Sequence, residues 1–179
     1  MDILAISGSL KATSTNSALL RAAAALAPAT MSFSFYDRQI GELPHFQPDL
    51  DEEGSIPPPA VADFRAQLAR ADGLLISCPE YAHGVPGAFK NALDWVVSSS
   101  EVTGKPTVLL MAGPGGATQA WAALTPTLRV MGFDLVFEAS LVVARRHFDG
   151  EGRLLDADLA AEVTRALTGL AAAVQNRAR

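Results

Sequence analysis

The chain has 179 residues, of which 49% are apolar and only 18% are charged, and its formal net charge is −5. This length suits one domain with a sizeable core, and the apolar content excludes intrinsic disorder. The acidic balance argues against a nucleic-acid or anionic-membrane partner, and the chain has no apolar run of the roughly 18 residues that a transmembrane helix needs. The low charged fraction favours an oligomer whose interface hides helix surface, with a monomer built around a large sheet as the alternative.

The N-terminal segment and the cysteine content predict a cytoplasmic protein. Residues 1–10 begin directly with a strand-like run and lack the basic stretch and long apolar core of a signal peptide. Cys78 is the single cysteine, which excludes an internal disulfide and fits a reducing compartment. No internal repeat, low-complexity tract or linker divides the chain, so we expect one domain over residues 1–179.

Short apolar runs alternate with segments of helical periodicity along the chain. The expected strands are 3–7, 32–36, 73–78, 106–112 and one within 133–143. The expected helices are 17–26, 60–71, 86–97, 117–131, which we expect to be interrupted near Pro126, and 156–175. Residues 37–59 are acidic and rich in proline without a clear period, which indicates a surface excursion.

Three of the expected strands, the first, third and fourth, are continuous apolar runs, as in strands that helices cover on both faces. Five β–α units with right-handed crossovers predict a doubly wound parallel sheet. The expected fold is therefore α/β, a flavodoxin-like three-layer sandwich with a five-stranded parallel sheet in the order 2-1-3-4-5. In such a sheet, ligands bind at the loops that leave the carboxyl ends of the central strands.

The loop after the first strand has the composition of a phosphate site. Residues 8–17, GSLKATSTNS, contain five hydroxyl side chains, the amide of Asn16 and the single charge of Lys11, and no carboxylate occurs between Asp2 and Asp37. Hydroxyl donors, one cation and a helix N-terminus suit a phosphate monoester. The alternative is that these residues only cap the helix. The loop lacks the glycine patterns of a P-loop or a dinucleotide fingerprint, so a monophosphate is favoured over a diphosphate.

The loops after the third and fourth strands complete a candidate site. The third strand leads into residues 79–95, PEYAHGVPGAFKNALDW, which present the acid of Glu80, the phenol of Tyr81 and the imidazole of His83. The fourth strand leads into the turn 113–116, GPGG, where a flat ligand could approach the backbone. An ordinary strand-to-helix turn is the alternative for this last segment. Together the three loops predict a site for a phosphorylated planar cofactor, which is the place of FMN in a flavodoxin-like sheet.

Two of these segments carry a specific resemblance. GSLKATSTN at 8–16 and the segment 79–95 resemble the NADPH-dependent FMN reductase family, whose patterns are G-S-L-R-x-x-S-x-N and P-E-Y-N-x-S-x-P-G-x-L-K-N-x-x-D-W. The resemblance covers nearly the whole chain. It implies bound FMN, NADPH or NADH as the electron donor, and hydride transfer to quinones, free flavin, azo compounds or metal oxyanions. It also implies a dimer or tetramer with the flavin near a subunit boundary.

The resemblance assigns cofactor-binding roles by position. In the first loop it implies phosphate contacts from Ser9, Lys11, Ser14, Thr15 and Asn16. In the second loop it implies that the isoalloxazine ring lies against Pro79, Glu80, Tyr81 and Ala82. In the third loop the matching residues are Gly113, Gly115 and Gly116. Because the flavin carries the chemistry, no catalytic side chain is expected.

Departures from the family patterns bear on the strength of binding. Lys11 stands where the pattern has arginine, which exchanges a bidentate contact for a point charge. Ala82 and Gly84 replace asparagine and serine, and the third loop lacks a serine and is shorter. These changes predict weaker or differently oriented flavin binding. The alternatives to a reductase are therefore a flavodoxin-type electron carrier and a flavin-binding protein with a degraded site.

Several polar side chains have more than one interpretation. The phenol of Tyr81 favours a ligand or subunit contact over core packing. The Glu80 side chain is expected to form an ion pair at an interface rather than to contact the flavin, and His83 to be a solvated loop residue rather than a proton donor. The basic cluster Arg145–His147 is expected to be a solvated edge, with attraction of NADPH phosphates as the alternative. No histidine has metal-ligand spacing, so no metal is predicted.

Overall fold

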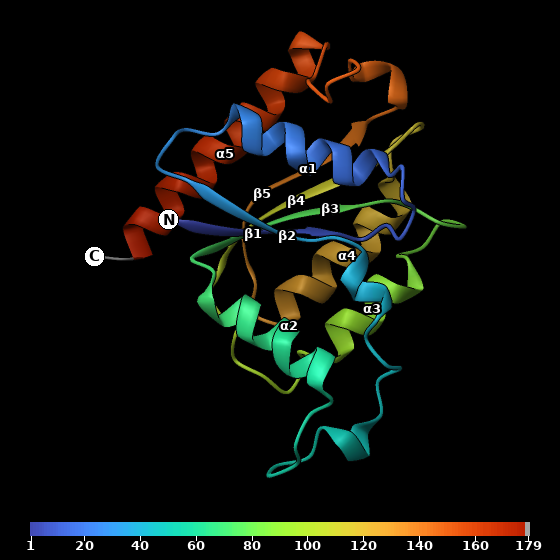
Figure 1. Cartoon of the computed structure of the whole chain (residues 1–179), viewed down its shortest axis with the longest axis vertical. Helices are drawn as coiled ribbons and strands as arrows, with labels where there is room; N and C mark the ends of the chain where they lie inside the picture. The colour runs from blue at the N-terminus through green and yellow to red at the C-terminus, as the bar shows by residue number, and fades with distance from the viewer. Residues whose placement is uncertain (178–179) are drawn as a thin grey trace.

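The computed structural model, which describes residues 1–177, contains one parallel sheet of five strands in the order β2-β1-β3-β4-β5. The order and the parallel pairing confirm the flavodoxin-like prediction (Figure 1). The strands are β1 (Asp2–Ser7), β2 (Ser32–Tyr36), β3 (Gly73–Cys78), β4 (Pro106–Gly113) and β5 (Asp134–Val142).

Helices cover both faces of the sheet and form the two outer layers of the sandwich. Figure 1 shows α1 and α5 on one face and α2, α3 and α4 on the other. The helices are α1 (Thr15–Leu26), α2 (Pro59–Arg70), α3 (Gly87–Asp94), α4 (Thr118–Val130) and α5 (Ala157–Arg177). Among the described residues, none of these helices has the length and apolar character needed to cross a lipid bilayer.

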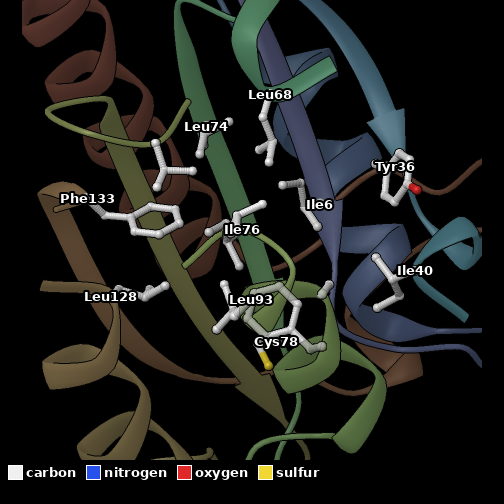
Figure 2. Packing of buried hydrophobic residues seen from close by; sticks show 14 of the residues in the cluster. Ile6, Tyr36, Ile40, Leu68, Leu74, Ile76, Cys78, Leu93, Leu128 and Phe133 are labelled. Carbon is white, nitrogen blue, oxygen red and sulfur yellow. The ribbon is translucent and has the colours of Figure 1, made fainter. Parts of the chain in front are cut away.

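The core is divided between the two faces because successive strand residues point in opposite directions. Leu74 and Ile76 of β3 pack on the face of α2, α3 and α4, where Figure 2 shows Phe133 and Leu128 beside them. Leu75, between these two residues, packs on the opposite face. All residues of β3 and β4 are buried. The continuous apolar runs in the sequence therefore reflect strands covered on both sides.

Helix α4 differs from the sequence prediction, because it continues through Pro126. A proline inside a helix removes one backbone hydrogen bond to the carbonyl four residues earlier. That carbonyl belongs to the exposed Ala122, where water can solvate it. Leu124 and Leu128 are buried on either side of Pro126 and hold the helix on the sheet. Tertiary packing therefore offsets the local cost of the proline.

Two further boundaries follow from tertiary contacts. Helix α3 ends at Asp94, three residues before the expected end, and the buried Trp95 donates from its indole to the carbonyl of Pro44 (2.7 Å). The acidic excursion 37–59 contains two short 3₁₀ turns, Arg38–Gly41 and Pro48–Leu50. The first of these turns lies beside the loop that follows β1, since a Cβ on Gly41 would lie 2.9 Å from the Leu10 side chain.

Candidate functional site

Three loops at the carboxyl edge of the sheet line one cleft of about 410 Å³. They follow β1, β3 and β4, the three central strands. Eleven of the twelve residues that the sequence predicted to bind the cofactor line this cleft: Ser9, Lys11, Ser14, Thr15, Asn16, Pro79, Glu80, Tyr81, Gly113, Gly115 and Gly116. Ala82 does not line it. Three residues that were not assigned a contact with the cofactor complete the lining: Thr13, Ala112 and Pro114.

The N-terminus of α1 forms one wall of the cleft and begins with a capping serine. Ser14 Oγ accepts hydrogen bonds from the N–H groups of Asn16 (3.1 Å) and Ser17 (3.3 Å). Ser14 is therefore a helix cap, but a hydroxyl both accepts and donates, so its own hydrogen is left for a ligand. The first turn of α1 has no acidic residue. The positive end of the helix dipole thus has no counter-charge within its own first turn.

The Asn16 side chain lies in a buried polar network beneath the first loop. Its Nδ2 donates to the carbonyl of Ala112 (3.2 Å), and its Oδ1 accepts from the hydroxyl of Ser77 (2.8 Å). Ser7, which pairs in register with Ser77, accepts from the hydroxyl of Ser17 (3.1 Å). Asn16 therefore ties the start of α1 to β3 and β4, and one of its amide hydrogens has no protein acceptor among the described residues.

Ser7 and Ser77 of this network were not predicted to belong to the site. The signal for them is a serine near the end of each of two apolar runs, LAIS at 4–7 and LLIS at 74–77. Because β1 and β3 are adjacent and parallel, both serines meet beneath the first loop. A buried hydroxyl in a strand needs a hydrogen-bond partner, and this need predicts a polar contact at the strand ends.

The carboxylate of Glu80 caps helix α4. Its Oε2 accepts hydrogen bonds from the N–H groups of Gln119 and Ala120, both at 2.9 Å, whereas Ala117 at the N-cap position offers no side-chain acceptor. The hydrogen bond from Ala120 is the main cause that holds the pKa of Glu80 below its usual value. The carboxylate is thus engaged within the chain, and its expected ion pair at an interface stays a prediction. The second loop is thereby fastened to the start of α4.

Ala82 and His83 form the tip of a tight turn. The N–H of Tyr81 donates to the carbonyl of Gly84 (3.0 Å) and the N–H of Gly84 donates to the carbonyl of Tyr81 (2.9 Å). Ala82 has φ +49° and His83 has φ +61°, as in a type I′ turn, which favours asparagine and glycine. The turn leaves Ala82 outside the cleft lining, and its contact with the flavin ring stays a prediction.

The turn also positions the side chains of Tyr81 and His83. The Tyr81 hydroxyl lies 3.3 Å from Ser9 Oγ and so bridges the second loop to the first. The Tyr81 side chain remains half-exposed. His83 is exposed and has its Nδ1 3.3 Å from Oε1 of Glu80. The histidine is thus a solvated loop residue, as expected, with one contact to the cap of α4.

The three glycines of the third loop differ in what requires them. Gly116 has φ +81°, and its N–H donates to the carbonyl of Gly113 (3.1 Å). A Cβ on Gly113 would lie 2.9 Å from the carbonyl oxygen of Gly116. These two positions need glycine for the turn itself. The fold does not require glycine at position 115, since a Cβ there would meet nothing within 4 Å. The bare backbone of Gly115 faces the cleft.

The charges around the cleft favour an anion. Lys11 is the one basic residue of the lining and Glu80 the one acidic residue. The Glu80 carboxylate is already bound to the amides of α4. Lys11 forms no ion pair with any carboxylate in residues 1–177. A free cation beside a helix N-terminus leaves the first loop with a net positive field.

Cys78, at the end of β3, contributes packing to this region. It is fully buried, and burial raises the pKa of its thiol. A Cβ on Gly8 would lie 2.8 Å from its sulfur, so the first loop passes directly over it. In the described part of the chain, no group of three histidine, cysteine or acidic side chains is placed to hold a metal ion.

This combination defines a class of protein. A doubly wound sheet in the order 2-1-3-4-5 binds FMN in the crevice where the strand order reverses. The cleft lies at that place and offers what FMN needs: hydroxyl donors and a cation for the phosphate, an aromatic side chain, and a bare backbone turn for the ring edge. The residues present therefore fit a flavodoxin-like FMN protein.

The chain belongs to the NADPH-dependent FMN reductase family, whose model matches residues 1–147. It is 38% identical over 162 residues to an NAD(P)H-dependent FMN reductase of Pseudomonas aeruginosa, covering 87% of this chain and 85% of the relative. It is 32% identical over 162 residues to a quinone reductase of Pseudomonas putida, with the same coverage. Among solved structures, the flavoenzyme NAD(P)H:(acceptor) oxidoreductase FerB of Paracoccus denitrificans superposes with a TM-score of 0.84 at 26% identity, covering 98% of this chain and 97% of that one.

Proposed function

We propose that this protein is an FMN-dependent NAD(P)H oxidoreductase that reduces quinones and related small acceptors. The observation that carries the proposal is the single cleft in which an acid-poor phosphate loop, an aromatic loop and a bare glycine turn come together. The names of the relatives, an NAD(P)H-dependent FMN reductase and quinone reductases, support the same activity. FMN, when bound, accepts hydride from NAD(P)H and passes the electrons to the acceptor.

The first loop would hold the phosphate. Lys11 supplies the positive charge and the hydroxyls of Ser14 and Thr15 supply donors at the start of α1. Asn16 keeps this start in place through its bonds to the ends of β3 and β4. Ser9 would contribute its hydroxyl, which exchanges the contact with Tyr81 for one with the phosphate.

The second and third loops would hold the ring. Pro79, Glu80 and Tyr81 form one side of the cleft, with Glu80 acting through its backbone because its carboxylate caps α4. At the third loop, the exposed backbone of Gly115 allows close approach of the ring edge. Backbone N–H groups at this edge would stabilise negative charge on the reduced ring.

The assembly and the compartment are part of the same proposal. We infer a homodimer or homotetramer, since the apolar side chains of Val97, which follows α3, and of Val130, the last residue of α4, are 64% and 87% exposed. Light scattering on the purified chain measures this state directly. The cytoplasm is the proposed compartment because the protein has a single, buried thiol and no disulfide to maintain.

The activity is tested by anaerobic mixing of the FMN-loaded protein with NADPH, and separately with NADH. The expected result is bleaching of the flavin absorbance, followed by recovery of the oxidised spectrum when a benzoquinone is added. A flavin that stays oxidised with both nicotinamides but accepts electrons from a partner reductase would indicate a flavodoxin-type carrier instead. A protein that stays colourless after incubation with FMN would indicate a degraded site.

A further inference from the structure

A second, smaller hollow borders the first turn of α1. Its volume is about 160 Å³. One side consists of Thr13, Ser14 and Thr15, which also line the main cleft, together with Ala18. The other side comes from the segment that follows β5, namely Arg145, Phe148, Asp149, Gly150 and Gly152. The segment Thr13–Thr15 therefore lines both hollows.

Arg145 brings an unpaired guanidinium to this hollow. It forms no ion pair or hydrogen bond through its side chain with any group in residues 1–177, and it is exposed. The carboxylate in the same hollow, Asp149, is already occupied. It accepts from the N–H groups of Glu151 (2.8 Å) and Arg153 (2.9 Å) and from Nε of Arg153 (2.7 Å). The free charge of the hollow is therefore positive.

The backbone around Arg145 is held in place although its side chain is free. Arg145 begins a short 3₁₀ turn that ends at His147. The N–H of Phe148 donates to the carbonyl of Arg145 (3.2 Å). Phe148 is buried in the core beneath α1 and α5 and pairs with Leu154. These contacts keep Arg145 beside the start of α1, although the two are far apart in the sequence.

We propose that Arg145 is a second cation of the flavin phosphate site, beside the segment Thr13–Thr15 that its hollow shares with the main cleft. The proposal rests on the proposed binding of the FMN phosphate at this turn. A phosphate monoester carries close to two negative charges at neutral pH. Lys11 offers a single point charge, whereas a guanidinium offers paired donors that match phosphate oxygens. Arg145 thereby supplies the bidentate donor that the first loop itself lacks.

The test compares Arg145→Ala with Arg146→Ala in flavin titrations of the full chain after its flavin has been removed. Arg146 is the matched control because it is the exposed neighbour of the same charge and does not line the hollow. FMN and riboflavin are titrated separately by fluorescence quenching, since riboflavin has the ring and ribityl chain without the phosphate. Riboflavin binding and circular dichroism also report whether each variant is folded.

Arg145→Ala is expected to weaken FMN binding about tenfold, as for loss of a charge-assisted bond, and to leave riboflavin affinity unchanged. Arg146→Ala is expected to change neither, and Arg145→Lys to recover part of the FMN affinity. Equal losses for both ligands, equal effects of the two alanine variants, or a higher KM for NADPH with unchanged FMN affinity would each overturn the proposal. A wild-type chain that binds no FMN would overturn the proposed function as well. Wild-type FMN binding with the same affinity in Arg145→Ala would overturn this proposal alone.

Discussion

The two edges of the sheet use lysine in opposite ways. At the amino edge, Lys105 is buried, and its Nζ donates to the backbone carbonyls of Leu68, Ala69 and Ala71 at the end of α2. At the carboxyl edge, Lys11 is exposed beside the start of α1 and has no carboxylate partner in residues 1–177. One cation is satisfied by the protein, and the other is left for a diffusible ligand.

The difference teaches where stability and binding are located. Lys105 neutralises the negative end of a helix dipole with three backbone acceptors, so it is part of the architecture. Lys11 adds to the positive end of a helix dipole, which is unfavourable for the empty protein and favourable once an anion binds. Substitutions at the amino edge should therefore change unfolding, and substitutions at the carboxyl edge should change flavin affinity.

The largest effect is expected for Lys105→Met. This change keeps the length of the side chain but leaves three carbonyls at the end of α2 without their donor, and each lost partner of a buried group costs about 1–3 kcal/mol. We expect the free energy of unfolding, measured by urea denaturation, to fall by about 2–3 kcal/mol. FMN affinity of the folded variant should stay within about twofold of the wild type. Weakened FMN binding without loss of stability would break the comparison.

Lys11→Met is expected to weaken FMN binding and to leave stability unchanged. Removal of this charge should raise the Kd for FMN about tenfold, with little change for riboflavin, because a charge-assisted contact with phosphate is lost. The urea midpoint should not fall. Lys90→Met is the control at another exposed lysine, which pairs with Asp94 on α3. If Lys90→Met weakened FMN binding as much as Lys11→Met, the loss would reflect overall charge rather than this loop.

In the loop after β4, substitutions of two neighbouring glycines are expected to separate stability from FMN affinity. Gly116→Ala should lower the free energy of unfolding by about 1 kcal/mol, because alanine is strained at positive φ and a Cβ would lie 3.2 Å from Ser140 Oγ. Gly115→Ala should leave stability unchanged, since its Cβ would meet no protein atom, but should weaken FMN binding. Urea denaturation and FMN titration of both variants measure this. Unchanged FMN affinity in Gly115→Ala would show that the ring edge does not approach this backbone.

A smaller gain is expected at the hairpin tip. Ala82→Asn should raise the free energy of unfolding by about 0.5 kcal/mol, because asparagine tolerates positive φ better than alanine. FMN affinity should not change, since residue 82 lies outside the cleft lining. Ser99→Asn, in an irregular segment elsewhere, serves as the control for the asparagine itself. A clear change in FMN affinity would indicate that residue 82 does contact the flavin ring.

The smallest effect is the pH dependence of the cap on α4. Hydrogen bonding, first of all from Ala120, lowers the pKa of Glu80 in the folded protein. The stabilisation is therefore present above the unfolded pKa of about 4.3 and is lost as the pH falls through the folded value. The difference in Tm between the wild type and Glu80→Gln should be constant near neutral pH and shrink below about pH 4. A difference that does not change with pH would argue against the ionised cap.

Much of the site followed from local patterns in the sequence. The apolar runs at 73–78 and 106–112 predicted strands buried on both faces, and parallel strands bring the loops at their carboxyl ends to one edge. The absence of carboxylates around Lys11 pointed to an anion, and the family pattern of 79–95 pointed to FMN. These features are local in the chain, so spacing and composition are sufficient to predict them.

Only the tertiary structure decided what individual side chains do at that edge. Glu80 reaches amides 39 and 40 residues away, and Asn16 reaches a carbonyl 96 residues away. Arg145 lies beside the start of α1 through the packing of the segment after β5. No local period encodes such contacts, because they depend on how separate elements are packed. The sequence alone determined where the cleft lies and which class of ligand suits it, whereas packing determined which side chains remain free to bind that ligand.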